Sequence, residues 1–226
     1  GCGILSSALC MDKQRAHELV KNQGIKVADA IVIKNTSDYS KAISTLQFPL
    51  FVKPVKAGSS YGISKVLDIQ DLKPAIDNAF KYDNEVIIEE AILGREVGCA
   101  IIGKDILEVG LVDEIELADG FFDYYEKYTL KTSKIHLPAR IDELTTKKIQ
   151  DTAMLIYRTL GCQGFARVDM FLTNNNEIYF NEVNTIPGFT THSRFPQMMK
   201  GIGYDFIELI DRIIEMGLKD GNDCTE

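Results

Sequence analysis

Two apolar segments in the C-terminal part of this 226-residue chain predict a buried β-hairpin. Residues 166–172 and 177–183 are each long enough for one strand, and the polar run of residues 173–176 joins them as a turn. Most residues in both segments are apolar, so the hairpin should run through a core, where an unpaired carboxylate costs free energy. Each charged residue on the hairpin is therefore expected to face a partner.

The polar residues of this hairpin fall on one face. Because side chains alternate across a strand, Arg167 shares a face with Asp169, and Glu182 shares one with Asn184. A loop of about four residues places Arg167 nearly opposite Glu182, with Asp169 on the diagonal. Oxygens of an Asp, a Glu and an Asn are the hard ligands that Mg²⁺ prefers, especially when phosphate completes its shell. The competing interpretation is a solvated face with a single Arg–Glu pair.

Composition excludes several classes of function. Asp and Glu number 33 against 25 Lys and Arg, so the net charge of −8 should repel nucleic acid. No run approaches the roughly 20 apolar residues that cross a bilayer, and no signal-peptide pattern is present, so we expect no membrane partner and a cytoplasmic location. The five cysteines are widely spaced and lack a C-x-x-C motif, which argues against a disulfide framework or a zinc site.

Strand and helix patterns alternate along the rest of the chain, which predicts a mixed α/β fold. Helices are expected after Asp12 and Asp142, each opened by that aspartate and ended by a glycine, Gly24 or Gly161. A last helix, residues 204–216, should bury Phe206, Leu209, Ile210, Ile213 and Ile214. The other expected elements are strands at residues 31–33, 50–53, 62–66, 86–90, 96–102 and 106–115 and helices near residues 37–46 and 72–80.

Two further segments carry groups that suit phosphate. Lys53 precedes the glycine- and serine-rich loop 57–62, whose N–H and O–H donors can hold phosphate. This loop lacks the residue order of a Walker A motif, and a plain turn explains it equally well. Residues 185–194 offer backbone N–H groups and hydroxyls to an anion. Residues 116–134 have no clean period and exceed ordinary loop lengths, which indicates a lid or a binding loop.

Taken together, these motifs resemble those of the ATP-grasp ligases, and most closely those of the D-alanine–D-alanine ligase branch. The motifs are Lys53 with the loop 58–62, Ile88-Glu89-Glu90-Ala91 with Glu96, Arg167-Val168-Asp169, and Asn181-Glu182-Val183-Asn184-Thr185-Ile186-Pro187-Gly188. The resemblance covers essentially the whole chain and implies an α/β (α+β) ATP-grasp fold with ATP between two sheets. A smaller central lobe, residues 1–92 with the segment leading into it, would act as a lid on the larger C-terminal lobe, residues 93–226.

The same resemblance implies a role for each motif residue. Lys13 and Lys53 would contact the ATP phosphates, under a flexible loop that contains Ser60 and Ser59, the latter also a catalytic group. Glu89, Ala91 and Ile92 would line the adenine pocket, with Glu96 on the ribose. Asp169, Glu182 and Asn184 would carry two Mg²⁺ ions, with Mn²⁺ as an alternative metal. Arg167 and the backbone N–H of Gly188 would form the oxyanion site, Ser193 and Arg194 would hold the carboxylate of the second substrate, and Lys127 and Tyr128 would cover the site from the long loop.

In this family the carboxylate of one amino acid attacks the γ-phosphate of ATP, and the amine of a second amino acid then attacks the acyl phosphate. The run Ser193-Arg194-Phe195-Pro196 resembles the vancomycin-resistance ligases, and Glu126-Lys127-Tyr128 resembles ligases whose second substrate is an amino acid. The expected reaction joins D-alanine to D-serine for peptidoglycan precursors and confers vancomycin resistance. A D-alanine–D-alanine ligase is the alternative.

Other classes of protein share parts of this pattern. They are a different ATP-grasp carboxylate–amine ligase, a nucleotide-binding module without turnover, and a structural α/β domain. The family also has an N-terminal domain that binds the first D-alanine, and this chain starts after it, with the uncharged run GCGILSSALC. We therefore expect the chain alone to bind ATP but to make no dipeptide. For the full-length protein, a homodimer is one expected assembly.

Overall fold

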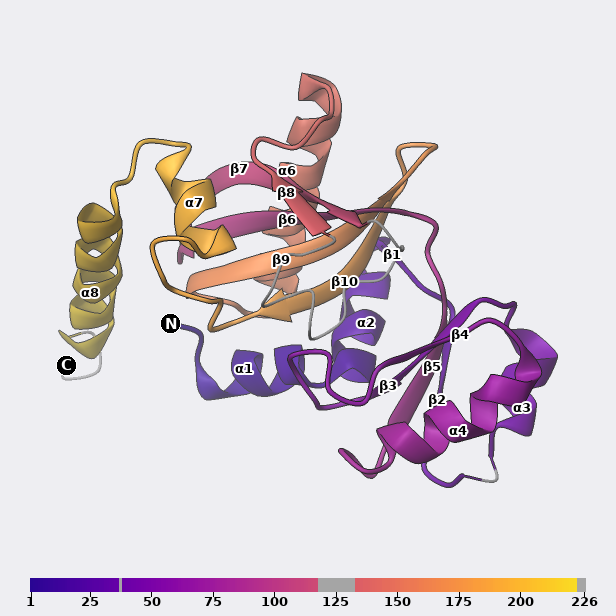
Figure 1. The fold of residues 1–226 in the computed structure, drawn as a ribbon. Coiled ribbons are helices and arrows are strands. Elements are labelled where there is room, and N and C mark those ends of the chain that lie inside the picture. The colour runs from indigo at the N-terminus through magenta and orange to yellow at the C-terminus, as the bar shows by residue number, and fades with distance from the viewer. Residues whose placement is uncertain (37, 118–132, 223–226) are drawn as a thin grey trace.

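The chain forms two β-sheets whose faces carry helices (Figure 1). The computed structural model describes residues 1–36, 38–117 and 133–222. The mixed α/β architecture predicted from the sequence is confirmed. Lys127 and Tyr128, and most of the long loop that carries them, lie outside the described residues.

The larger sheet has six strands in the order β1-β10-β9-β6-β7-β8. These are β1 (Lys26–Val27), β10 (Ile178–Asn184), β9 (Gly164–Thr173), β6 (Gly94–Gly103), β7 (Leu107–Leu117) and β8 (Ser133–His136). The predicted hairpin is formed by β9 and β10, and the predicted pairing across residues 103–105 is formed by β6 and β7. Strand β1 adds to the edge of β10 in parallel, whereas the other pairs are antiparallel.

The smaller sheet has four antiparallel strands in the order β2-β5-β3-β4. These are β2 (Ala30–Ile33), β5 (Val86–Glu90), β3 (Leu50–Pro54) and β4 (Ser64–Val66), and helices α3 (Ser40–Thr45) and α4 (Ile69–Ala79) pack against them. Leu72 and Ile76 of α4 meet Leu50, Val52 and Ile88 of the sheet in one buried cluster. The helical stripe predicted for residues 72–80 therefore faces this core.

Helices lie on both faces of the larger sheet (Figure 1). Helices α1 (Ile4–Met11), α2 (Lys13–Lys21) and α6 (Glu143–Thr159) cover one face, and α7 (Arg194–Lys200) covers the other, with α8 (Phe206–Asn222) packed beside α7. The predicted N-caps are confirmed, because Asp12 and Asp142 accept hydrogen bonds from the backbone N–H of Arg15 and Thr145. The uncharged opening run forms α1.

The prediction for the last helix is wrong in part. Of its five expected core residues, Leu209 is fully buried, whereas Phe206, Ile210 and Ile213 are half-buried and Ile214 is 54% exposed. Helix α8 packs at the side of the larger sheet, where it contacts α7 and β9. A helix that packs on neighbours from one side only cannot bury the whole of a broad apolar stripe.

The register of the β9–β10 hairpin also differs from the prediction. Glu182 lies opposite Asp169, and Asn184 lies opposite Arg167, whereas the sequence placed Glu182 opposite Arg167. The turn is one residue longer than assumed, and a β-bulge lies between Phe180 and Glu182. Two shifts of one residue preserve the face of each side chain, so the four polar residues still share a face as predicted.

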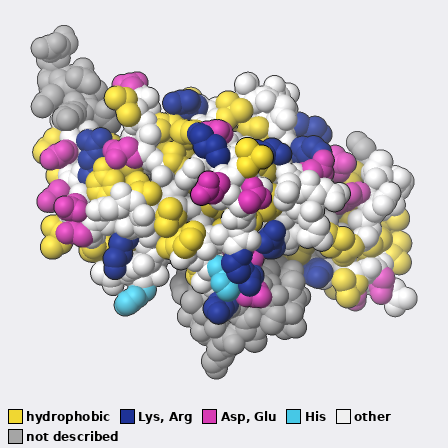
Figure 2. All heavy atoms as spheres, turned by 90° about the horizontal axis from the view of Figure 1, so that it is seen from above, with side chains coloured by type: hydrophobic (Ala, Val, Ile, Leu, Met, Phe, Trp, Pro, Cys, Tyr) yellow, Lys and Arg dark blue, Asp and Glu magenta, His cyan; other side chains and the backbone are white. Residues whose placement is uncertain are grey.

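Charged residues of both signs are interspersed on the surface shown in Figure 2, as expected for a dispersed negative charge. Within the described ranges, no helix is long and apolar enough to cross a bilayer.

Candidate nucleotide-binding site

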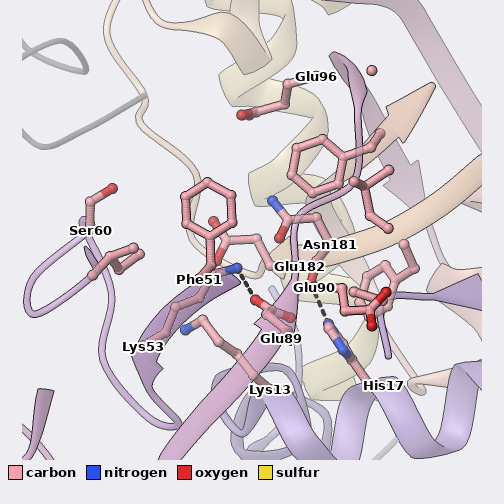
Figure 3. A pocket seen from close by; sticks show the side chains of 16 residues that line it. Lys13, His17, Phe51, Lys53, Ser60, Glu89, Glu90, Glu96, Asn181 and Glu182 are labelled. Atoms are coloured by element: carbon pink, nitrogen blue, oxygen red, sulfur yellow. Dashed lines mark hydrogen bonds and ion pairs between the residues drawn. The ribbon is translucent and has the colours of Figure 1, made fainter. Parts of the chain in front are cut away.

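A pocket lies between the two sheets and is lined by residues of both (Figure 3). Its empty volume, open mouth included, is about 940 Å³, which suits a small molecule or cofactor. Residues predicted to bind ATP or metal that line this pocket are Lys13, Lys53, Ser60, Glu89, Ile92, Glu96 and Glu182. The structure therefore brings together residues that are far apart in the sequence.

Lys53 and Glu89 form an ion pair inside the pocket. They come from neighbouring strands, β3 and β5, whose register sets Phe51 opposite Glu89. The Nζ of Lys53 also lies 5.6 Å from the centre of the Phe51 ring. Burial of the Glu89 carboxylate is the largest influence and opposes its charge, but Lys53, His17 and Lys13 together outweigh burial and hold the pKa of Glu89 below its ordinary value. The Lys53–Glu89 pair thus presents one cationic and one anionic group to a ligand in the pocket.

Replacing Lys53 should cost both stability and ligand binding. Lys53→Ala leaves the buried Glu89 without its cation, which should lower the free energy of unfolding by about 3 kcal/mol. The double variant Lys53→Ala/Glu89→Gln removes the unpaired charge and should recover most of that loss, while ATP binding stays absent. Thermal unfolding and calorimetry measure the two effects separately. Recovery of ATP binding together with stability would show that Lys53 acts only through the fold.

The loop that follows β3 lies close to Lys13. The Nζ of Lys13 donates a hydrogen bond of 2.7 Å to the carbonyl oxygen of Ala57, which ties helix α2 to this loop. Ser59 and Ser60 have φ values of 52° and 58°, in the left-handed region that non-glycine residues rarely adopt. Ser60 lines the pocket, whereas Ser59 is exposed and does not.

The polar face of the hairpin forms a compact hydrogen-bonded group. Arg167 holds Asp169 in a fork, with Nε–Oδ1 and Nη2–Oδ2 distances of 2.7 Å. The Nδ2 of Asn184 donates to Asp169 Oδ2 at 2.8 Å and lies 3.5 Å from Glu182 Oε1. Asn184 is therefore within hydrogen-bonding distance of both Asp169 and Glu182, so the three predicted metal ligands lie together.

The chemistry of these donors fits Mg²⁺. Two carboxylates and an amide supply oxygen atoms, and Mg²⁺ in phosphate-transfer sites commonly uses one or two carboxylates together with phosphate oxygens. In the described part of the chain, no group of three or more His, Cys, Asp and Glu side chains could hold a metal ion. A metal ion bound by Asp169 and Glu182 would therefore need Asn184 or phosphate oxygens as further ligands. Because Arg167 contacts both oxygens of Asp169, a metal ion at Asp169 has to share or displace this contact.

Arg194, at the start of α7, connects the pocket to the hairpin face. Its side chain is 10% exposed, and its Nε and Nη2 form a fork with Asp113 at 2.7 and 2.8 Å. The same guanidinium lies 3.4 Å from Glu96 and 3.6 Å from Asp169. Burial disfavours the charge, but these carboxylates outweigh burial and raise the pKa of Arg194 above its ordinary value.

Two residues beside Arg194 were not predicted from the sequence. Asp113 of β7 is 1% exposed, and Gly98 of β6 lies against the guanidinium. A Cβ at Gly98 would stand 2.4 Å from Nη2 of Arg194, so a larger residue there would displace the arginine. A carboxylate in an apolar strand indicates a buried partner, but the partner of Asp113 is Arg194, 81 residues further along the chain.

The remaining predicted residues that the structure describes do not line this pocket. Ser193 Oγ accepts a hydrogen bond of 3.0 Å from the backbone N–H of Thr190. Gly188 faces Ser193, since a Cβ at Gly188 would lie 3.1 Å from Ser193 Oγ. Ala91 is half-buried next to the lining residue Ile92. Gly188, expected in the oxyanion site, and Ser193, expected to hold the second substrate, thus lie side by side in one loop.

Known proteins match most of this chain. A family model described as D-ala D-ala ligase C-terminus matches residues 19–215. The crystal structure of VanG D-Ala:D-Ser ligase from Enterococcus faecalis has 58% identity and a TM-score of 0.88, covering 95% of this chain and 63% of that one. Vancomycin C-type resistance protein VanC2 of Enterococcus casseliflavus is 43% identical over 95% of this chain and 62% of its own length. A D-alanine–D-alanine ligase of Chlorobium luteolum is 42% identical over 97% of this chain and 63% of its own length.

The two sheets and their neighbours among solved structures define the ATP-grasp class of ligases. Within that class, the chain belongs to the D-alanine–D-alanine ligase family. The resemblance identified from the sequence motifs is therefore confirmed. The chain spans 62–63% of the lengths of the three relatives described above.

Proposed function

We propose that the protein carrying this chain is an ATP-dependent ligase that joins D-alanine to D-serine through an acyl phosphate. The observation that carries the proposal is a single pocket bordered by the Lys53–Glu89 pair on one side and by Glu182 on the other. A nucleotide in this pocket reaches both the cationic groups that suit its phosphates and the oxygen ligands that suit its metal ion.

ATP binds in the pocket with its phosphates toward Lys13 and Lys53 and its base toward Glu89, Ala91 and Ile92. Glu96 contacts the ribose. The positive φ values of Ser59 and Ser60 support a role for their loop over the phosphates, because such backbone strain often occurs at functional sites. Lys127 and Tyr128 complete the cover.

The chemistry has two steps. Asp169, Glu182 and Asn184 would hold Mg²⁺, which would supply positive charge beside the phosphates. The D-alanine carboxylate attacks the γ-phosphate, and ADP leaves as the acyl phosphate forms. Arg167 and the backbone N–H of Gly188 then donate to the oxyanion that forms when the second amine attacks the acyl phosphate, and this intermediate collapses to the dipeptide with release of inorganic phosphate. The fork of Arg167 on Asp169 supports this assignment, because it orients the guanidinium beside the metal ligands.

Ser193 and Arg194 hold the second amino acid by its carboxylate. The 58% identity to a protein described as a D-Ala:D-Ser ligase favours D-serine as that amino acid. A D-alanine–D-alanine ligase is the second candidate, because the relative from Chlorobium luteolum is 42% identical, close to the 43% of VanC2. With D-serine as acceptor, the product enters peptidoglycan precursors and confers vancomycin resistance.

Arg194→Lys should weaken binding of the acceptor amino acid without weakening binding of ATP. Lysine keeps the charge but cannot form the two-point fork that Arg194 makes with Asp113. We expect the KM for D-serine to rise roughly tenfold, equivalent to about 1.4 kcal/mol, while the KM for ATP stays within about twofold. Steady-state kinetics with each substrate varied in turn measure both values. Equal changes in the two KM values would show that Arg194 does not contact the acceptor.

We further propose that the chain divides between residues 92 and 93 into two lobes. Residues 1–92 form the lid, and residues 93–226 form the larger C-terminal lobe. Because the reaction consumes ATP, we place it in the cytoplasm. A further domain, which the family resemblance implies, would orient the first D-alanine.

A further inference from the structure

One extra residue in β10 decides which face of the larger sheet carries Glu182. Phe180 lies in the core beneath helices α2 and α6. Because side chains alternate along a strand, an unbroken β10 would point Glu182 into that same core. The β-bulge inserts Asn181 and reverses the alternation, so that Val183 enters the core and Glu182 faces Asp169.

The carbonyl oxygen of the bulge residue Asn181 has a partner outside the sheet. Edge strand β1 pairs with β10 up to Val27, which lies beside Phe180, and the pairing stops there. One residue further, Asn181 accepts a hydrogen bond from Nε2 of His17 at 2.8 Å. A carbonyl can only accept, so Nε2 must carry the hydrogen. His17 of helix α2 thus continues the hydrogen bonding of β10 where the edge strand ends.

The His17 ring is fixed in place by its surroundings. The residue is 7% exposed, and its ring meets Phe180 edge-on with 5.3 Å between the centroids. Burial lowers the pKa of His17, as do Lys53 and Lys13, while Glu89 opposes them. The ring is therefore neutral and donates from Nε2. Figure 3 shows the contact between His17 and Asn181 at the border of the pocket.

We propose that His17 is a positioning residue whose hydrogen bond to the Asn181 carbonyl maintains the bulge and thereby directs Glu182 toward the metal ion. This inference rests on the proposed metal-binding role of the hairpin face. Without the donor, a part-buried carbonyl loses its partner. The alternative register, which points Glu182 into the core, then competes with the bulged one. His17 acts on the metal through the backbone of β10 and does not touch it.

The variants His17→Gln and His17→Met separate hydrogen bonding from packing, because the two side chains have similar lengths and only Gln can donate. Glu18→Gln, on the exposed side of the same helix, is the matched control. Calorimetry of a non-hydrolysable ATP analogue is carried out at a series of Mg²⁺ concentrations, including zero, on the protein that carries this chain. For His17→Met we expect the Mg²⁺ concentration at half-maximal enhancement to rise roughly tenfold. For His17→Gln it should stay within about threefold of the unsubstituted protein, and binding without Mg²⁺ should not change in either variant.

An unchanged Mg²⁺ dependence in His17→Met would overturn the inference. Equal losses in His17→Met and His17→Gln would also overturn it, because they would indicate packing rather than the hydrogen bond. Glu182→Gln in the same assay identifies which proposal fails. If Glu182→Gln abolishes the Mg²⁺ dependence and His17→Met does not, only the role of His17 is wrong. If Glu182→Gln also has no effect, the metal site is wrong and the inference falls with it.

Discussion

Glu182→Gln should weaken Mg²⁺-dependent ATP binding by roughly 100-fold or more, because loss of a residue that merely supports a metal ligand commonly costs 10–100-fold. The substitution removes one negative charge and keeps the shape of the side chain. Glu182 borders the pocket and lies opposite Asp169, so these two carboxylates would hold the proposed metal ion beside a nucleotide in the pocket. ATP binding without Mg²⁺ should stay close to that of the unsubstituted protein. Calorimetric titrations with and without Mg²⁺ measure both affinities.

Glu177→Gln is the matched control for this experiment. Glu177 lies beside the same hairpin and pairs with Lys26 on the surface, away from the pocket. The same chemical change there should leave Mg²⁺-dependent binding unaltered, since an exposed ion pair contributes little to stability. If both variants bind ATP and Mg²⁺ like the unsubstituted protein, Glu182 is not a metal ligand.

Arg167→Lys should lower turnover by about 100- to 1000-fold, the range seen when one donor to a reacting oxyanion is lost. Lysine keeps the positive charge but cannot reproduce the fork that Arg167 forms with Asp169. We expect the KM values for ATP and the amino acids to change far less than kcat, because the proposed donation strengthens mainly in the transition state.

Arg212→Lys serves as the control for the arginine substitution. Arg212 pairs with Glu108 at 3.1 Å, in contact with neither the pocket nor the hairpin face. Its variant should retain full activity. A loss in Arg167→Lys that is confined to the KM for ATP would reassign Arg167 from the oxyanion to nucleotide binding.

The polar face of the hairpin was predictable because alternation along a strand depends only on local sequence. The pairing register of the two strands was not predictable. A bulge and a longer turn both shift the register, and neither removes the apolar pattern of the strands. One signal was present: the buried positions run Ile178, Phe180, Val183, and the spacing changes from two to three at Asn181. That change marks the inserted residue.

Contacts between distant segments account for what the sequence did not reveal. Arg194 was expected to bind a substrate. Its fork on Asp113 could not be predicted, because the sequence does not show that β7 and α7 are in contact. The role of His17 could not be predicted either, because a histidine on the buried side of an amphipathic helix usually packs in the core. In α8, the apolar stripe predicted a fully buried face, yet burial depends on neighbours that a stripe does not specify.

The most direct test of the proposed function is product formation by the protein that carries this chain, with ATP, Mg²⁺ and D-alanine plus a second substrate. D-serine, D-alanine and D-lactate are offered in separate reactions, and product and released phosphate are quantified together. We expect one phosphate per product and the highest kcat/KM with D-serine. A higher kcat/KM with D-alanine would contradict the assignment and support the D-alanine–D-alanine ligase. Absence of any ATP-dependent product would contradict ligase function altogether.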